Sequence, residues 1–201
     1  MKKHSHIWKI LIFDMFVIEF GPVGVFFIAY YFSSFSIAAF SLAVATLLAL
    51  IASKLINKRV PWFAIFSGTI TIITAMVTYF FDMPGVLIFK DTVFYFLFAV
   101  LLGLSIWKGK NLFKAFFGHI FAIKDEGWIA LERRWIIFFV AAGSSNEFVR
   151  IFLSADEWVI YKQVVVIFFL GFGLYQFRIS NKYRLPEADK LGLRKLSSRV
   201  S

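Results

Sequence analysis

The feature that most restricts the fold of this chain is a series of apolar runs, each close to the length of a membrane span. An α-helix needs about 20 mainly apolar residues to cross roughly 30 Å of hydrocarbon. Because lipid offers no hydrogen-bond partners to the backbone, each run must be helical. The sequence therefore predicts an all-α, polytopic membrane protein of about six transmembrane helices. The predicted spans are residues 10–32, 36–53, 62–81, 86–107, 135–153 and 159–178.

Composition supports a membrane protein and excludes several other classes. The 201 residues are 60% hydrophobic and only 17% charged, whereas ordinary globular chains are about a quarter charged. The sequence contains no cysteine, which excludes disulfides, thiolate metal sites and cysteine nucleophiles. We expect a single transmembrane domain at residues 1–180, followed by a basic cytoplasmic tail at residues 181–201.

The first predicted span leaves an alternative open. Asp14 and Glu19 interrupt its apolar run, and Gly21-Pro22 interrupts the helical pattern, since proline removes a backbone hydrogen bond and bends a helix. If residues 1–20 lay along the membrane surface, the protein would have five spans and an external N-terminus. Six spans fit better, because residues 22–53 are too long for one ordinary span and suit a hairpin that turns at Ser33-Ser34.

The basic residues predict the orientation, because cytoplasmic loops of membrane proteins carry an excess of Lys and Arg. Of the 22 Lys and Arg residues, 19 fall in the N-terminus, after the second span, after the fourth span and in the tail. The opposite side keeps only three, namely Lys90, Arg150 and Lys162. This asymmetry predicts that both termini lie in the cytoplasm. The net charge of +10 is thus explained by topology and anionic lipid, without a nucleic-acid partner.

Aromatic residues mark the span ends and the long inner loop. Five of the six tryptophans lie at or near predicted span ends, as in an interfacial aromatic belt; they are Trp8, Trp62, Trp107, Trp135 and Trp158. In residues 110–121 the aromatic and aliphatic side chains recur at helical spacing, with Lys110 and Lys114 on another face. This pattern predicts a short helix on an anionic membrane surface, although a solvated linker remains possible. Asp125 is predicted to cap the helix that becomes the fifth span.

No motif for catalysis or for a cofactor is present. The Gly21-Pro22-Val23-Gly24 segment lacks the lysine of a phosphate-binding loop. The three histidines, His4, His6 and His119, do not form a metal-binding pattern. We therefore expect no enzyme activity, metal or cofactor.

Charged residues inside the apolar runs are the candidates for function or for helix pairing, because ionisable groups are costly at membrane depth. Glu19 lies in the first span, and Glu147 and Arg150 lie in the fifth. Glu147 and Arg150 are three residues apart and hence neighbours on one helix face. We expect them to pair or to reach the outer surface; an ion or substrate path is the alternative.

Two segments resemble the intracellular septation protein A family of bacterial inner-membrane proteins. The first is Ile18-Glu-Phe-Gly-Pro-Val-Gly-Val-Phe-Phe27, and the second runs from Asp125 to Lys162. Lys90 and Thr92 resemble a Lys-Pro-Thr segment of that family, but Asp91 replaces the proline and Tyr95 stands where asparagine is usual. The resemblance covers about residues 10–180. Its matching positions are Asp125, Glu126, Gly127, Trp128, Arg134, Trp135, Asn146, Glu147, Arg150, Trp158, Val159 and Lys162.

The resemblance implies a non-enzymatic role in envelope maintenance and septation, through contacts with division and wall-synthesis proteins. It supplies no catalytic residues. The alternative from a different class is a transporter or channel for a small solute or lipid component, because broken helices and intramembrane carboxylates often line transport sites. The residues predicted to matter for structure or interaction are Glu19, Gly21, Pro22, Asp125, Trp128, Arg134, Trp135, Asn146, Glu147, Arg150, Trp158 and Lys162.

Overall fold

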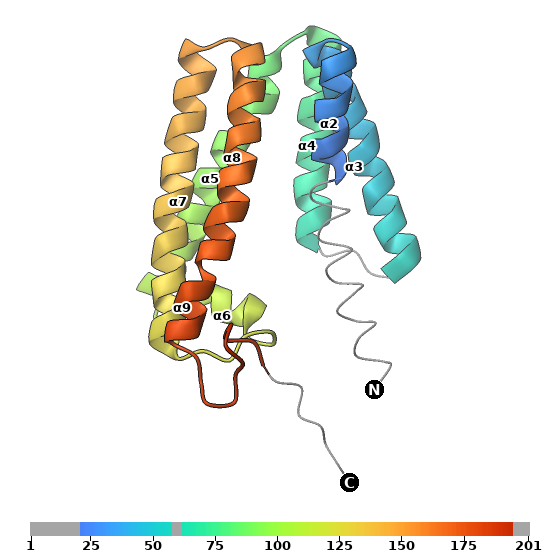
Figure 1. Cartoon of the computed structure of the whole chain (residues 1–201). Coiled ribbons are helices and arrows are strands. Elements are labelled where there is room, and N and C mark those ends of the chain that lie inside the picture. Colours follow the sequence, from blue (N-terminus) through green and yellow to red (C-terminus); the bar gives the residue numbers. More distant parts are fainter. Residues whose placement is uncertain (1–20, 58–61, 195–201) are drawn as a thin grey trace. The chain divides into compact units, whose positions relative to one another are not determined.

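A computed structural model of the chain describes residues 21–57 and 62–194, and these residues are mainly helical (Figure 1). The elements are α2 (Gly21–Phe32), α3 (Phe35–Asn57), α4 (Trp62–Phe81), α5 (Pro84–Trp107), α6 (Leu112–Phe117), α7 (Asp125–Phe152), α8 (Ala155–Tyr175) and α9 (Phe177–Lys182). Extended structure within the described ranges consists of isolated β-bridges, two of which join Phe121 and Ile123 to the C-terminal segment. The predicted all-α class is confirmed.

Five helices are long and apolar enough to cross a membrane, and they coincide with the second to sixth predicted spans. They comprise α3, α4, α5, α7, and α8 with α9. The predicted turn at Ser33-Ser34 is also present, since α2 ends at Phe32 and α3 begins at Phe35. Of the first predicted span, the described part is α2, whose 12 residues are too few to cross a bilayer alone. The rest of that span lies outside the described residues.

The outer faces of these helices carry many large apolar side chains that the protein does not cover. Leu48, Ile137 and Ile167 are 59%, 69% and 71% exposed. Contiguous apolar surface of this kind is rare on soluble monomers and is expected where side chains contact lipid. The exposed apolar faces therefore agree with the membrane location that the sequence predicts.

The chain divides into two compact units. Unit 1 comprises Met1–Asp91 and Arg150–Val159, and unit 2 comprises Thr92–Val149 and Ile160–Ser201. The boundary falls within α5, α7 and α8, so each of these helices contributes residues to both units.

In unit 1, α3 packs against both α2 and α4. Close packing is possible because α3 presents small side chains, and Ala38 and Ala39 are fully buried; small residues let membrane helices approach closely. At one end of the unit, the Ser36 hydroxyl donates to the Asp82 carboxylate over 2.5 Å. This bond ties the beginning of α3 to the turn between α4 and α5.

In unit 2, α7 packs against α5 and α8 through aromatic side chains. Phe139 of α7 stacks against Phe98 of α5, with ring centroids 5.4 Å apart. On the α8 side, Phe138 stacks against Phe172 with centroids 4.7 Å apart. Gly143 lets α5 approach, because a Cβ atom there would lie 3.1 Å from the ring of Phe96. The three helices are thus held together by ring contacts and by one close backbone approach.

One end of unit 2 carries a small folded region, which we call the cap (Figure 1). The cap consists of α6, residues 118–124, the first turns of α7, α9 and residues 183–194. Its core is formed by Ile123, Trp128, Leu131 and Ile179, all buried, with Phe113, Phe121 and Tyr183 packed around them. Residues 183–194 fall in the predicted basic tail at 181–201, but their hydrogen bonds to residues 120–124 make them part of the cap.

Candidate functional site

The most buried polar contact between spans of unit 2 joins α5 to α7. Asn146, which is fully buried, donates from its side-chain nitrogen to the Thr92 hydroxyl over 2.9 Å. The Thr92 hydroxyl in turn donates to the Glu147 carboxylate over 3.1 Å. The chain of hydrogen bonds from Asn146 through Thr92 to Glu147 therefore uses the hydroxyl both as acceptor and as donor. We call these three residues the polar clasp.

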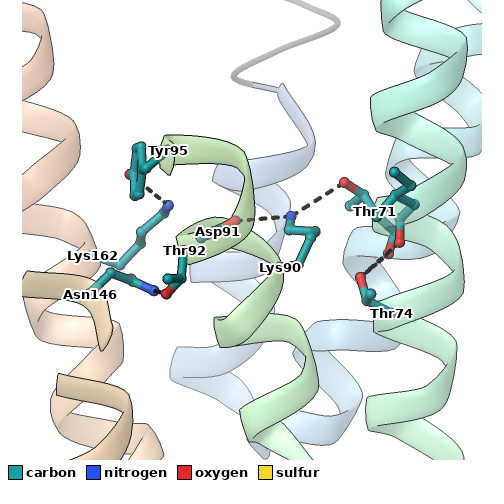
Figure 2. Close-up of polar contacts among 9 residues, drawn as sticks. Thr71, Thr74, Lys90, Asp91, Thr92, Tyr95, Asn146 and Lys162 are labelled. Carbon is teal, nitrogen blue, oxygen red and sulfur yellow. Dashed lines mark hydrogen bonds and ion pairs between the residues drawn. The ribbon is translucent and has the colours of Figure 1, made fainter. Parts of the chain in front are cut away.

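Residues close in sequence to the polar clasp make further polar contacts between the helices of unit 2. Ser145 and Tyr161 share a hydrogen bond of 2.7 Å between α7 and α8. Lys162 of α8 lies 3.4 Å from the Tyr95 hydroxyl of α5, with its ammonium 5.5 Å from the centre of that ring. Figure 2 shows Lys162 extending toward Tyr95 and Asn146 toward Thr92. Polar groups of α5, α7 and α8 thus bind one another inside the apolar helices.

Unit 1 contains its own polar contact, at the part of α5 that precedes Thr92. The ammonium of Lys90 lies 3.1 Å from the Asp91 carboxylate, and both side chains are largely buried. Lys90 also donates to the hydroxyl of Thr71 in α4 over 3.3 Å (Figure 2). Lys90 and Lys162 therefore lie inside α5 and α8 rather than in outer connections.

Glu147 and Arg150 each have a contact to α5. Glu147 accepts from Thr92 in unit 2, whereas the Arg150 guanidinium lies over the ring of Phe89 in unit 1, 5.4 Å from its centre. Their mutual pairing stays a prediction. Glu19, the other predicted intramembrane carboxylate, lies outside the described residues.

In the cap, side chains from three elements satisfy the first backbone N–H groups of α6. These groups have no partner inside a helix and need one elsewhere. The Leu112 N–H donates to the Ser105 hydroxyl over 2.8 Å, and the Phe113 N–H donates to the Glu132 carboxylate over 2.9 Å. The Lys114 N–H donates to Asn111, the N-cap residue, over 2.8 Å. Side chains of α5 and α7 therefore fix the beginning of α6.

Glu132 is the carboxylate most deeply enclosed in the described chain, since its side chain is 0% exposed. One of its oxygens holds the Phe113 N–H, while the other, Oε2, has no hydrogen-bond partner among the described residues. Sequence reasoning missed Glu132. A signal was present, because Trp128, Leu131, Glu132 and Trp135 recur at the spacing of one helix face, which places the carboxyl group on the buried side.

The segment from Asp125 to Trp135 builds much of the cap. Asp125 is the first residue of α7 and forms an ion pair of 2.5 Å with Lys114. Trp128 is 2% exposed and lies in the cap core. The Arg134 guanidinium lies 5.6 Å from the centre of the Tyr175 ring. Trp135 packs against Phe172 of α8, with ring centroids 5.0 Å apart.

The C-terminal segment is hydrogen bonded to the loop that precedes α7. The N–H groups of Ala122 and Lys124 donate to the carbonyls of Gly192 and Tyr183, each over 2.9 Å. Two glycines make this docking possible. A Cβ atom on Gly127 would lie 2.6 Å from Tyr183, and Gly192 adopts a φ of +79° that strongly favours glycine.

The remaining predicted residues lie in unit 1. Pro22 is buried in the first described turn of α2, which begins at Gly21. Trp158 is 3% exposed and packs against Phe35, with ring centroids 5.8 Å apart. The predicted aromatic belt therefore needs a correction for Trp158, which is enclosed by protein. Trp107, at the end of α5, is 79% exposed, as a side chain facing lipid headgroups would be.

Comparison with known proteins identifies the family. The family model described as intracellular septation protein A matches residues 15–186. A relative from Nitrobacter hamburgensis, named inner membrane-spanning protein YciB, is 29% identical over 85% of this chain and 86% of its own length. The protein of that name from Yersinia pestis is 31% identical over 87% of this chain and 97% of its own. No solved structure matches the chain. From the span of the family match and these two relatives, the chain belongs to the intracellular septation protein A family.

Proposed function

We propose that this protein is a non-enzymatic inner-membrane scaffold that supports septation and envelope integrity by binding division and wall-synthesis proteins. The observation that carries the proposal is the cap. In the segment from Asp125 to Trp135, the residues Gly127, Trp128 and Glu132 pack inside a folded region at the end of the spans. A folded region with charged residues on its surface, at the end of the spans, suits the recognition of other proteins.

The outer surface of the cap carries charge of both signs. The exposed charged residues are Lys124, Glu126 and Arg133. Along the chain they lie on either side of the buried Trp128 and Leu131. Charged groups at the rim of an interface add specificity and speed of association more than affinity. The surface around Arg133 is therefore the part of the cap that we assign to partner proteins.

The intramembrane polar groups support a structural role. Asn146 and Glu147 are hydrogen bonded to Thr92, and hydrogen bonds of this kind help to hold membrane helices together. Within residues 21–57 and 62–194, no group of three His, Cys, Asp or Glu side chains gathers to hold a metal ion. A scaffold needs the polar clasp for helix packing, whereas a transporter needs the Glu147 carboxylate itself.

Complementation of a deletion strain separates the two functions. One variant carries Lys124→Ala and Arg133→Ala on the cap surface, and the other carries Glu147→Gln. Glutamine keeps an acceptor oxygen for the Thr92 hydroxyl but removes the ionisable group. At matched membrane abundance, the scaffold predicts misplaced septa or osmotic sensitivity for the cap variant and near-normal growth for Glu147→Gln.

Two controls complete the experiment. The first control replaces Lys190, an exposed lysine of the C-terminal segment of the cap, and so removes a positive charge outside the segment from Asp125 to Trp135. Glutamine at position 126 tests whether charge of the other sign matters. Full rescue by the cap variant together with failure of Glu147→Gln would favour the transporter and contradict the scaffold.

A further inference from the structure

A pocket lies between the end of α5, α6 and the first turns of α7, within unit 2. Its volume is about 240 Å³, and it is partly open. Its lining includes the apolar Ile106 and Ile129 and the polar Lys110, Asn111, Lys114 and Asp125. The pocket therefore offers apolar side chains to hydrocarbon and two ammonium groups to an anion.

The pocket lies at the C-terminal end of α5, and another face of this helix carries an exposed apolar stripe. Val100, Leu104 and Trp107 are 56%, 44% and 79% exposed, and their spacing of three to four residues places them on one face of the helix. This stripe belongs to a helix of 24 residues that is long enough to span a bilayer. Its exposed face therefore contacts acyl chains, and the pocket lies where the headgroups begin.

The backbone turns sharply at the pocket and brings two lysines to it. Gly109 has a φ of +63°, a left-handed conformation that ends α5 and redirects the chain toward α6. Lys110 follows at once and is exposed. Lys114, in the first turn of α6, forms an ion pair of 2.5 Å with the Asp125 carboxylate, and both side chains remain more than half exposed.

We propose that this pocket binds the phosphate group of an anionic phospholipid. Lys110 and Lys114 supply the positive charge, and Ile106 and Ile129 contact the glycerol region and the first carbons of the acyl chains. Lipid is the favoured occupant because Ile106 and Ile129 line the pocket beside the two lysines, at the end of a helix long enough to span a bilayer. A soluble anion would leave these apolar side chains unused. The inference stands apart from the partner proteins proposed above.

Asp125 lowers the affinity of the site for an anion. Its carboxylate occupies Lys114 and adds negative charge beside the bound phosphate. Removal of this charge frees Lys114 for the lipid, so Asp125→Asn should strengthen binding. A helical surface that merely attracted anions through its overall charge would respond in the same direction, but it would respond equally to charge changes elsewhere on the cap.

The test uses the full-length protein purified in a neutral detergent and native mass spectrometry with added lipids. The lipids are phosphatidylglycerol, which is anionic, and phosphatidylethanolamine, which is zwitterionic. Lysines near anionic lipid contribute roughly 1 kcal/mol each, which is about fivefold in affinity. The double variant Lys110→Gln and Lys114→Gln should have an affinity for phosphatidylglycerol that is lower by about fivefold per lysine. Asp125→Asn should have a higher affinity for this lipid than the wild type.

The matched control is Lys182→Gln with Lys190→Gln, which removes the same charge from exposed sites outside the pocket. It should retain phosphatidylglycerol as the wild type does. Equal loss in both double variants, or equal retention of the two lipids by the wild type, would overturn the proposal. Displacement of the lipid by millimolar inorganic phosphate would assign the site to free phosphate and overturn it as well. If the Lys110/Lys114 variant does not fold, an unchanged retention in Asp125→Asn would still contradict the proposal.

Discussion

At the scale of single residues, Glu132 is the side chain whose position demands most explanation. A carboxyl group that is 0% exposed is costly unless hydrogen bonds compensate for the loss of water. Its bond to the Phe113 N–H also satisfies a backbone group at the start of α6. Glu132 therefore links α7 to the beginning of α6.

Replacement of Glu132 should loosen α6. Glu132→Ala removes the acceptor of the Phe113 N–H and leaves a gap, and loss of one partner of a buried hydrogen bond costs about 1–3 kcal/mol. Hydrogen–deuterium exchange should become faster at residues 112–117, while Glu132→Gln, which keeps an acceptor oxygen, should have a smaller effect. The exposed Glu126→Gln serves as the control. Unchanged exchange in Glu132→Ala would contradict this role.

Gly127 controls the docking of the C-terminal segment. A Cβ atom there would approach Tyr183 to 2.6 Å, so Gly127→Ala should push residues 183–194 away from the cap. Trypsin should then cut more rapidly after Arg184 and Lys190 than in the wild type. Gly171→Ala is a suitable control, because no atom lies within 4 Å of its added Cβ. Equal cleavage in both alanine variants would refute the steric argument.

At the scale of elements, the spans and the cap depend on different kinds of interaction. The spans could be predicted because a long apolar run needs only its own length and the bilayer to become a helix. The cap could not, since Ala122 and Lys124 pair with Gly192 and Tyr183, which lie about sixty to seventy residues further along the chain. No local pattern in residues 183–194 predicts that pairing.

The contacts of the polar clasp also could not be predicted from the sequence. The sequence singled out Glu147 as a charged residue within an apolar run, and it pointed to Asn146 and Thr92 only through the family resemblance. That Asn146 and Glu147 both bind Thr92 depends on how α5 and α7 pack, which periodicity alone does not determine. The candidate residues were thus predictable, whereas their partners were not.

A double-mutant cycle measures the clasp between α5 and α7. Thr92→Val and Asn146→Leu each remove one side of the hydrogen bond, and their combination removes both. Hydrogen bonds between membrane helices contribute about 0.6 kcal/mol on average and up to about 1.7 kcal/mol, so the coupling energy should fall in that range. Ser144→Ala, at an exposed position of α7, replaces Asn146→Leu in the control cycle. Strictly additive effects of Thr92→Val and Asn146→Leu on stability in detergent would show that the contact contributes nothing.

At the scale of the whole molecule, the proposed function requires the cap to lie in the cytoplasm, where division proteins can reach it. The 19 basic residues assigned to one side predict this orientation. The turns between α2 and α3, between α4 and α5, and between α7 and α8 should then face the opposite compartment. The absence of cysteine allows each position to be tested with one introduced thiol.

The most direct measurement is cysteine labelling in intact cells with a reagent that does not cross the inner membrane. Single cysteines replace His119 in the cap, and Ser34, Met83 and Leu153 in the three turns, all of which are exposed positions. We predict that the thiols at 34, 83 and 153 react, and that the thiol at 119 reacts only after the membrane is permeabilised. Labelling of position 119 in intact cells, with protection of the other three, would place the cap outside the cytoplasm and contradict the account.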